Sequence, residues 1–364
     1  MHAVNRNGRP YTSRQIPWIA NSPFPVDLSF LDTALEDFHS PVVDHLKLEF
    51  TGSITTVGVS FLSEDQARVY QQIFLKDGMG ERIDLRGTEL RAVNFMLFGS
   101  GYEDPAAIGV GVTANTTVWL TIPGEHPYKM RRRTDGAISV RELIEKGELR
   151  LRSAAAVVVT GCTINSGNYR MHAYIRERIG PQAQSRMRWK SDALTLLEDT
   201  YAIGGQLFAA WPLAQVDPGP GYTSWLGMTE VDSMDLGYSD TLNTYLQEVY
   251  RAESRGIFAT DQLESGVSFP TYFPRYGQSL ADLPNLRTLK LRYSGIAVPA
   301  NSRLITGVLT DRDAEIAAKD LGFESPGAAA VALARGGHIA GTAAPWKDAD
   351  AILRGRLPVA LNGK

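Results

Sequence analysis

The sequence predicts an all-β fold with short helical insertions. Three observations support this prediction across the 364 residues. Brief segments alternate apolar with polar residues and are rich in β-branched and aromatic side chains, which is typical of half-buried strands. Helical patterns are few and short, and long connections are rich in glycine and proline. Strands and long helices do not alternate regularly, so a parallel α/β sheet is disfavoured.

The first half of the chain contains several strand patterns. In "HLKLEF", Leu46, Leu48 and Phe50 alternate with polar neighbours, as expected of a strand with one buried face. The later segments repeat this alternation or form short apolar runs. The strands expected in this half are 45–50, 53–61, 92–98, 116–122 and 148–159.

The second half continues in the same manner. "YRMHAYI" and "RTLKLRYSGI" alternate clearly, and the segments between the patterns contain turn-forming residues. The strands expected here are 169–175, 206–214, 287–296 and 303–309.

The expected helices are short and begin at capping residues. Ser139 with Glu142 forms a capping-box pattern that opens a helix ending at Gly147. Ser63 with Gln66 predicts a second helix over 63–75 in the same way. Further helices are expected at 239–256, from about Thr310 and at 328–335.

Composition excludes several classes of protein. The net charge of −3 gives no global attraction to nucleic acid or to an anionic membrane. Cys162 is the only cysteine, so no intrachain disulfide and no zinc site with several cysteines can form, and we expect a buried thiol. The first residues lack an apolar core, so we expect no signal peptide, and no apolar run is long enough to span a membrane.

Motifs for catalysis and for cofactor binding are absent from the sequence. There is no phosphate-binding loop, no serine nucleophile elbow and no metal-ligand spacing among the six histidines. Asp232, Asp235 and Asp240 cluster but do not fit a calcium-binding loop. We therefore expect no enzyme, and no catalytic, cofactor-binding or metal site.

Basic residues are the strongest functional signal. They concentrate in an N-terminal arm (1–26), in "KMRRR" and in 176–190, although the chain as a whole is acidic. Such segments are most often solvated loops, but on one face they would hold phosphates without reading sequence. The candidate anion contacts are Arg6, Arg9 and Arg14 in the arm and Arg131, Arg132 and Arg133 in the loop.

The passage 116–154 resembles a known family. A strand ends at a proline, a polar connection leads to a short capped helix, and an alternating strand follows directly. This resembles the double jelly-roll major capsid proteins of tailless icosahedral bacteriophages, often membrane-containing, in the lineage of the adenovirus hexon. The resemblance implies two adjacent eight-stranded jelly-roll β-sandwiches in each chain. It also implies homotrimers that form pseudo-hexagonal capsomers.

The resemblance implies an organisation and a set of partners. We expect an arm (1–26), a first jelly roll (27–160), a second (161–310) and a helical, Ala/Gly-rich extension (311–364). The partners would be other copies of the chain, minor capsid or vertex proteins, and an internal membrane or packaged genome through the basic arm. The protein would assemble in the host cytoplasm and reside in the virion.

Two other functions are compatible with the sequence. A carbohydrate-binding or carbohydrate-active β-sandwich would use Trp119, Trp189, Trp211 and Trp225 to stack on sugars. A phage tail or receptor-binding protein would share the β-rich, trimeric character.

Overall fold

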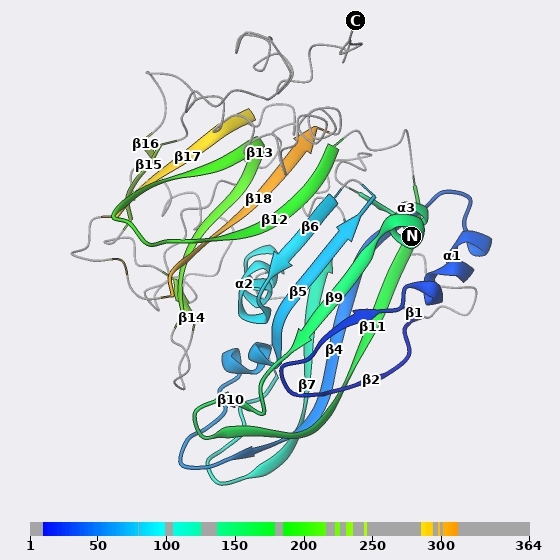
Figure 1. The fold of residues 1–364 in the computed structure, drawn as a ribbon, viewed down its shortest axis with the longest axis vertical. Helices are drawn as coiled ribbons and strands as arrows, with labels where there is room; N and C mark the ends of the chain where they lie inside the picture. The colour runs from blue at the N-terminus through cyan, green and yellow to red at the C-terminus, as the bar shows by residue number, and fades with distance from the viewer. Residues whose placement is uncertain are drawn as a thin grey trace, which may run out of the picture. The chain divides into compact units, whose positions relative to one another are not determined.

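The computed structural model describes residues 10–78, 80–98, 105–124, 137–178, 185–215, 223–225, 231–235, 244–245, 285–293, 298 and 301–311. The chain divides into two compact units. The first comprises Met1–Ala183, Trp189–Ser191 and Leu213–Ser224, and the second comprises the remaining residues. Figure 1 shows the strands and helices of both units.

One sheet of the first unit is built around a long central strand. β4 (Pro41–Thr56) pairs antiparallel with β11 (Cys162–Glu177) on one side and with β7 (Thr113–Pro123) on the other. Alternation puts Leu46, Leu48 and Phe50 on the buried face, as the sequence predicts. Short strands extend this sheet: β1 (Tyr11–Thr12), β2 (Ile16–Pro17) and β10 (Val157–Val159) on β11, and β8 (Ile138–Ser139) on β4.

The opposite sheet of the first unit has β5 at its centre. β5 (Tyr70–Asp77) pairs antiparallel with β6 (Gly80–Leu85) and with β9 (Glu148–Ser153), and β3 (Pro23–Val26) lies beyond β9. Trp189 and Lys190, which belong to this unit, pair in parallel with Ile83 and Asp84 of β6.

Tyr169 of β11 packs between the two sheets. Its ring centroid lies 5.2 Å from that of Phe24 on β3 and 5.3 Å from that of Tyr70 on β5, both in the opposite sheet. On its own sheet the ring contacts Phe50, with centroids 5.1 Å apart. The first unit is therefore a β-sandwich with an aromatic contact at its centre.

Short helices lie at the end and along the side of this sandwich. α3 (Val140–Lys146) begins at Ser139, whose hydroxyl accepts a hydrogen bond from the Glu142 N–H at 3.5 Å, and Gly147 follows its end, as predicted. α3 packs beside η1 (Ser29–Leu31) and α1 (Asp32–Asp37). α2 (Gly87–Phe98) and η2 (Glu64–Val69) pack against β7.

Several predicted elements differ in the structure. Residues 63–75 form only the 3-10 helix η2 before β5 begins, because sheet pairing with β6 and β9 takes precedence over the helical pattern. The predicted strand 92–98 lies inside α2, since a short apolar run does not distinguish a strand from a helix. Within the predicted helix 239–256, the described residues Thr244 and Tyr245 form β16. The helix predicted from about Thr310 does not begin there, because Thr310 and Asp311 belong to the end of strand β18 (Arg303–Asp311). The rest of that segment and the predicted helix at 328–335 lie outside the described residues.

The boundary between the two units also differs from the expected one. We expected the second jelly roll to begin at residue 161, but β11 pairs with β4 along nearly its whole length. The strand therefore completes the first sandwich, and the first unit continues to Ala183.

The second unit is also built of strands. Its described strands follow the order β16–β15–β17–β13–β18–β12. β13 pairs antiparallel with β17, and β17 pairs antiparallel with β15. Buried Tyr201, Leu289 and Leu304 belong to its core. The strands that lie wholly in this unit are β15 (Val231–Asp235), β16 (Thr244–Tyr245), β17 (Asn285–Tyr293) and β18 (Arg303–Asp311). The strands that it shares with the first unit are β12 (Ser185–Ala193), β13 (Glu198–Gln215) and β14 (Thr223–Trp225).

Candidate functional site

From residue 10 onward the basic arm is part of the first sandwich. β1 and β2 pair with β11, which belongs to one sheet, and β3 pairs with β9, which belongs to the other. Ser13 strengthens the first contact, since its N–H donates to the Met171 carbonyl and its hydroxyl accepts from the Met171 N–H, both at 2.9 Å. The arm thus runs from one sheet to the other, covers both edge strands and leaves fewer unpaired backbone groups.

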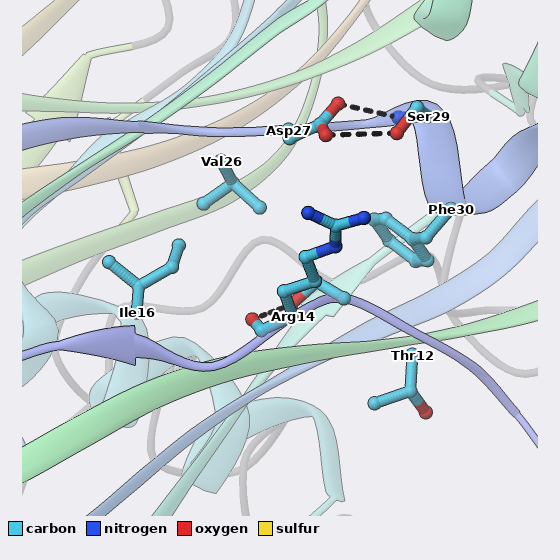
Figure 2. Close-up of a pocket in the computed structure, with 8 residues that line it drawn as sticks. Thr12, Arg14, Ile16, Val26, Asp27, Ser29 and Phe30 are labelled. Carbon is cyan, nitrogen blue, oxygen red and sulfur yellow. Dashed lines mark hydrogen bonds between the residues drawn. The ribbon is translucent and has the colours of Figure 1, made fainter.

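The arm lines an open cavity of about 290 Å³. Arg14 is the cationic residue of its lining, and Asp27 the acidic one. Figure 2 shows the Arg14 guanidinium extending toward the turn that carries Asp27 and Ser29. The cavity is lined by Thr12, Ser13, Arg14, Ile16, Val26, Asp27, Ser29 and Phe30.

Asp27 is held in its charged form. Its carboxylate accepts hydrogen bonds from the Ser29 N–H at 3.0 Å and from the Ser29 hydroxyl at 2.9 Å. These bonds lower the pKa of Asp27, and the positive charge of Arg14 lowers it further. Since an anionic ligand would meet this carboxylate beside Arg14, the cavity is electrostatically mixed and is not a simple anion pocket.

Only one predicted anion contact falls within the described part of the chain. Arg14 lies exposed beside the cavity. Arg6, Arg9, Arg131, Arg132 and Arg133 lie outside the described residues.

The basic segment 176–190 is partly structural. Arg186 is buried, and the Arg176 Nε lies 3.8 Å from the Asp44 carboxylate. Arg178 donates its backbone N–H to the Ser40 carbonyl at 2.9 Å. The described residues here belong mostly to β11 and β12 and not to a solvated loop, while 179–184 lie outside the described residues.

A polar row crosses the outer face of the β1–β11–β4–β7 sheet. The Nδ1 of His172 lies 3.1 Å from the Thr12 hydroxyl, and its Nε2 lies 2.8 Å from the Glu49 carboxylate. When Nε2–H donates to Glu49, Nδ1 accepts the hydroxyl proton of Thr12. Trp119 of β7 completes the row, with its ring centroid 5.3 Å from that of His172.

This row links four strands that are distant in sequence. A second set of contacts lies farther along β4 and β11, where the His45 ring stacks on Tyr174 at 4.2 Å and the Lys47 ammonium lies 5.7 Å from the Tyr174 ring. The sequence analysis did not identify these groups as a cluster. The alternation of each strand shows that they face outward, but only the register places them side by side.

The side chains of the row bind one another across neighbouring strands. A hydroxyl, an imidazole and a carboxylate in sequence resemble a nucleophile relay, but the Thr12 hydroxyl is also 3.3 Å from the Pro10 carbonyl and lies on an exposed strand. Within the described ranges, no group of three or more His, Cys, Asp or Glu side chains could hold a metal ion. The row's evident physical effect is to fix the arm to the sheet.

The tryptophans named as candidates for stacking on sugars, and the single cysteine, differ in their exposure to solvent. Trp119 is 40% exposed on the outer face, whereas Trp189 is fully buried and belongs to the core. The side chains of Trp211 and Trp225 lie outside the described residues. Cys162 is a buried free thiol, as predicted. No helix in the described part of the chain is both long enough and apolar enough to cross a bilayer.

Comparison with known proteins gives matches at the level of structure. No family model and no curated protein matches the sequence. A crystal structure of the major capsid protein of Sulfolobus turreted icosahedral virus is similar over 83% of this chain and 96% of that chain, with a TM-score of 0.50 and 13% identity. A chain in an atomic structure of that virus gives a TM-score of 0.51 and 13% identity, over 83% of this chain and 90% of that one. The major capsid protein P2 of bacteriophage PM2 matches with a TM-score of 0.40 and 9% identity, over 81% and 97%.

The first two matches confirm the predicted fold. They extend over most of both chains, and the structure consists mainly of strands in two units with short helices. The chain has the double jelly-roll fold.

Proposed function

We propose that this protein is the major capsid protein of an icosahedral virus, a structural subunit that binds other copies of itself. The single observation that carries the proposal is the double jelly-roll fold, matched over 83% of this chain and 96% of a viral major capsid protein. The subunit forms homotrimers with a pseudo-hexagonal outline, and these associate with each other and with minor capsid or vertex proteins in the virion. Assembly takes place in the host cytoplasm.

The described surface supports a role that does not involve turnover. The polar row and the arm contacts hold neighbouring strands together. The exposed outer faces of the sheets are then the surfaces through which copies of the chain associate. Sandwich subunits of this kind form closed shells when their interfaces are related by rotation, because each interface then closes on itself.

The arm arginines have a specific place in this proposal. Arg6, Arg9 and Arg14 are the candidates for contact with a genome or with membrane head groups. Arg14 faces a carboxylate and is the weaker candidate. Replacing Arg6 and Arg9 with Gln should lower the nucleic acid or lipid content of purified particles more than Arg14→Gln does. Equal content in all variants would contradict this role.

Purification of the full chain tests the main proposal. Sedimentation at micromolar concentration should show a trimer, and negative-stain microscopy should show hexagonal particles or shells. A chain that stays monomeric across the concentration range and forms no particles would overturn the proposal.

One observation favours a second function, binding of a neutral glycan. Trp119 is exposed beside His172 and Glu49, and an aromatic ring next to hydrogen-bonding groups is the usual way of stacking a sugar. A glycan array with the wild-type protein and the Trp119→Ala variant tests it. Binding that the substitution abolishes would support this function, and the absence of binding would eliminate it.

A further inference from the structure

One end of the first sandwich exposes apolar side chains. Three turns meet there: the turn after β4, the turn before β7 and the turn between β10 and β11. Figure 1 shows these strand ends beside β10, at the opposite end of the sandwich from α1 and α3. Four exposed valines form what we call the valine tip: Val57 at 70%, Val110 at 57%, Val157 at 56% and Val112 at 43% exposure.

The turns of the valine tip are bound to one another. The Val57 N–H donates to the Gly161 carbonyl at 2.7 Å, and the Thr56 N–H donates to the Val112 carbonyl at 2.9 Å. The Thr56 hydroxyl adds a bond to the Gly109 carbonyl at 2.6 Å. The backbone of the three turns is therefore one connected surface, and its association with a partner requires little ordering.

Each turn also contains a glycine with a positive φ angle. Gly58, Gly111 and Gly161 have φ values of 73°, 70° and 85°. Other residues rarely adopt this conformation, so these glycines permit the tight turns that project the valines outward.

The segments that form the valine tip carry no charge. The three segments that build it and the adjoining strands, 50–63, 105–124 and 153–169, contain no Asp, Glu, Lys, Arg or His, although charged residues make up 21% of the chain. Beyond these segments, Glu49 and Arg170 lie in the same sheet well away from the turns. Asp65 lies near enough to Cys162 to raise the pKa of its thiol, but Asp65 is buried and is paired with buried Arg68 at 2.9 Å.

We infer that the valine tip binds the valine tips of other copies of this chain around the threefold axis of the proposed trimer. At such an axis each residue meets its own copies, so a charged side chain would face a like charge. A surface of small apolar side chains without charge avoids this repulsion and excludes water from the contact. This inference rests on the proposed assembly function.

Two other partners fit the valine tip less well. Surfaces that lie on a bilayer usually combine large apolar or aromatic side chains with Lys or Arg, and the three charge-free segments contain no basic residue. An interface with an unlike protein usually gains specificity from complementary charges on the two partners, and the three charge-free segments offer none.

Lysine substitution tests the inference. The double variant Val57→Lys/Val110→Lys should raise the trimer dissociation constant of the full chain at least about tenfold, because like charges would meet at the axis. Val57→Thr/Val110→Thr keeps the shape and the neutrality and should have a much smaller effect. Leu196→Lys, at a residue of the second unit that is 58% exposed, is the matched control and should leave the constant unchanged.

Cross-linking tests whether identical residues meet. Because Cys162 is buried and is the only cysteine, Val110→Cys gives a protein with one accessible thiol. A short bismaleimide should link two copies of the Val110→Cys variant in the assembled state but should not link the wild type. Leu196→Cys should give few linked dimers.

The outcomes distinguish this inference from the proposed function. A trimer that is unaffected by lysine at both positions and is not linked through Val110→Cys would overturn the valine-tip contact while leaving the capsid role intact. A wild-type chain that never associates would overturn both. Co-flotation of the wild type with neutral phosphatidylcholine vesicles, abolished by the lysine variant while the trimer persists, would replace the inference with a lipid contact.

Discussion

The carboxamide of Asn94 in α2 binds both backbone groups of Thr121 in β7. Its Nδ2 donates to the Thr121 carbonyl at 2.6 Å, and its Oδ1 accepts from the Thr121 N–H at 2.7 Å. The side chain thus occupies the position that a neighbouring strand would take. Because β7 is at the end of its sheet, this contact helps to protect an edge that could otherwise pair with another chain.

Replacement of Asn94 should loosen β7. Asn94→Ala leaves the two Thr121 backbone groups without this partner, which should cost about 2–3 kcal/mol of local stability. Amide hydrogen exchange of residues 113–123, followed by mass spectrometry, should become faster. Asn115→Ala, at an exposed position of the same strand, is the control and should change exchange little. Unchanged exchange in the Asn94→Ala variant would contradict the protective role.

The Tyr169 hydroxyl should make stability depend on alkaline pH. Burial raises the pKa of Tyr169 above its ordinary value, and the hydroxyl donates to the Val69 carbonyl at 2.7 Å. The unfolded phenol ionises near pH ~10 while the folded one stays neutral, so this contribution is complete below that pH and declines above it.

Comparison with Tyr169→Phe isolates this effect. At pH 8 the variant should be less stable by about 1 kcal/mol, the typical value of one hydrogen bond. Above pH ~10 the difference should narrow, because only the wild type loses stability through this residue. Denaturant unfolding at pH 8 and above pH ~10 measures the difference in unfolding free energy between the wild type and the variant. If this difference is the same at both pH values, the Tyr169 hydroxyl does not cause the pH dependence.

The thiol of Cys162 should be inert in the folded protein. It is buried, and burial raises the pKa of the thiol, with the Asp65 carboxylate contributing to the increase. Since the thiolate is the reactive form, Ellman's reagent at pH 8 should modify Cys162 only when the protein opens or unfolds. An Ala156→Cys variant carries one additional exposed thiol, which should react at once. Immediate reaction of the wild type would show that the site is accessible.

Gly167 should resist substitution because of the ring of Phe50. A Cβ atom on Gly167 would lie 2.6 Å from two atoms of this buried ring. A Cβ atom on Gly52, which faces Gly167 on the neighbouring strand, would likewise lie 2.6 Å from the Cζ of the ring. Gly167→Ala should therefore destabilise the first unit by about 1–3 kcal/mol. Thermal unfolding measures the change.

Two further variants check the cause of that loss. Gly109→Ala would place its Cβ no closer than 4.0 Å to Val112 and should be nearly neutral. Phe50→Leu in the Gly167→Ala background should recover part of the expected loss, so that the two effects are not additive. Strict additivity would exclude the ring contact as the cause.

The sequence by itself determined the class of fold and several of its elements. Alternation at Leu46, Leu48 and Phe50 is enough to predict a strand with one buried face, and Ser139 with Glu142 is enough to predict α3. These features depend on neighbours that are close in sequence, so their signals are complete within a short window. The resemblance carried by 116–154 supplied the double jelly-roll arrangement, which the solved structures confirm.

The tertiary structure alone decided the secondary structure of the ambiguous segments. Residues 92–98 became helix and 70–75 became strand, because the available partner strands determine the state of a short apolar run. It also decided which distant residues meet: the row of Thr12, His172, Glu49 and Trp119, and the valine tip, are products of strand register. Register depends on pairing between segments that are far apart in the sequence, such as those of Thr12 with His172 and of Glu49 with Trp119, and no local pattern in the sequence records that pairing.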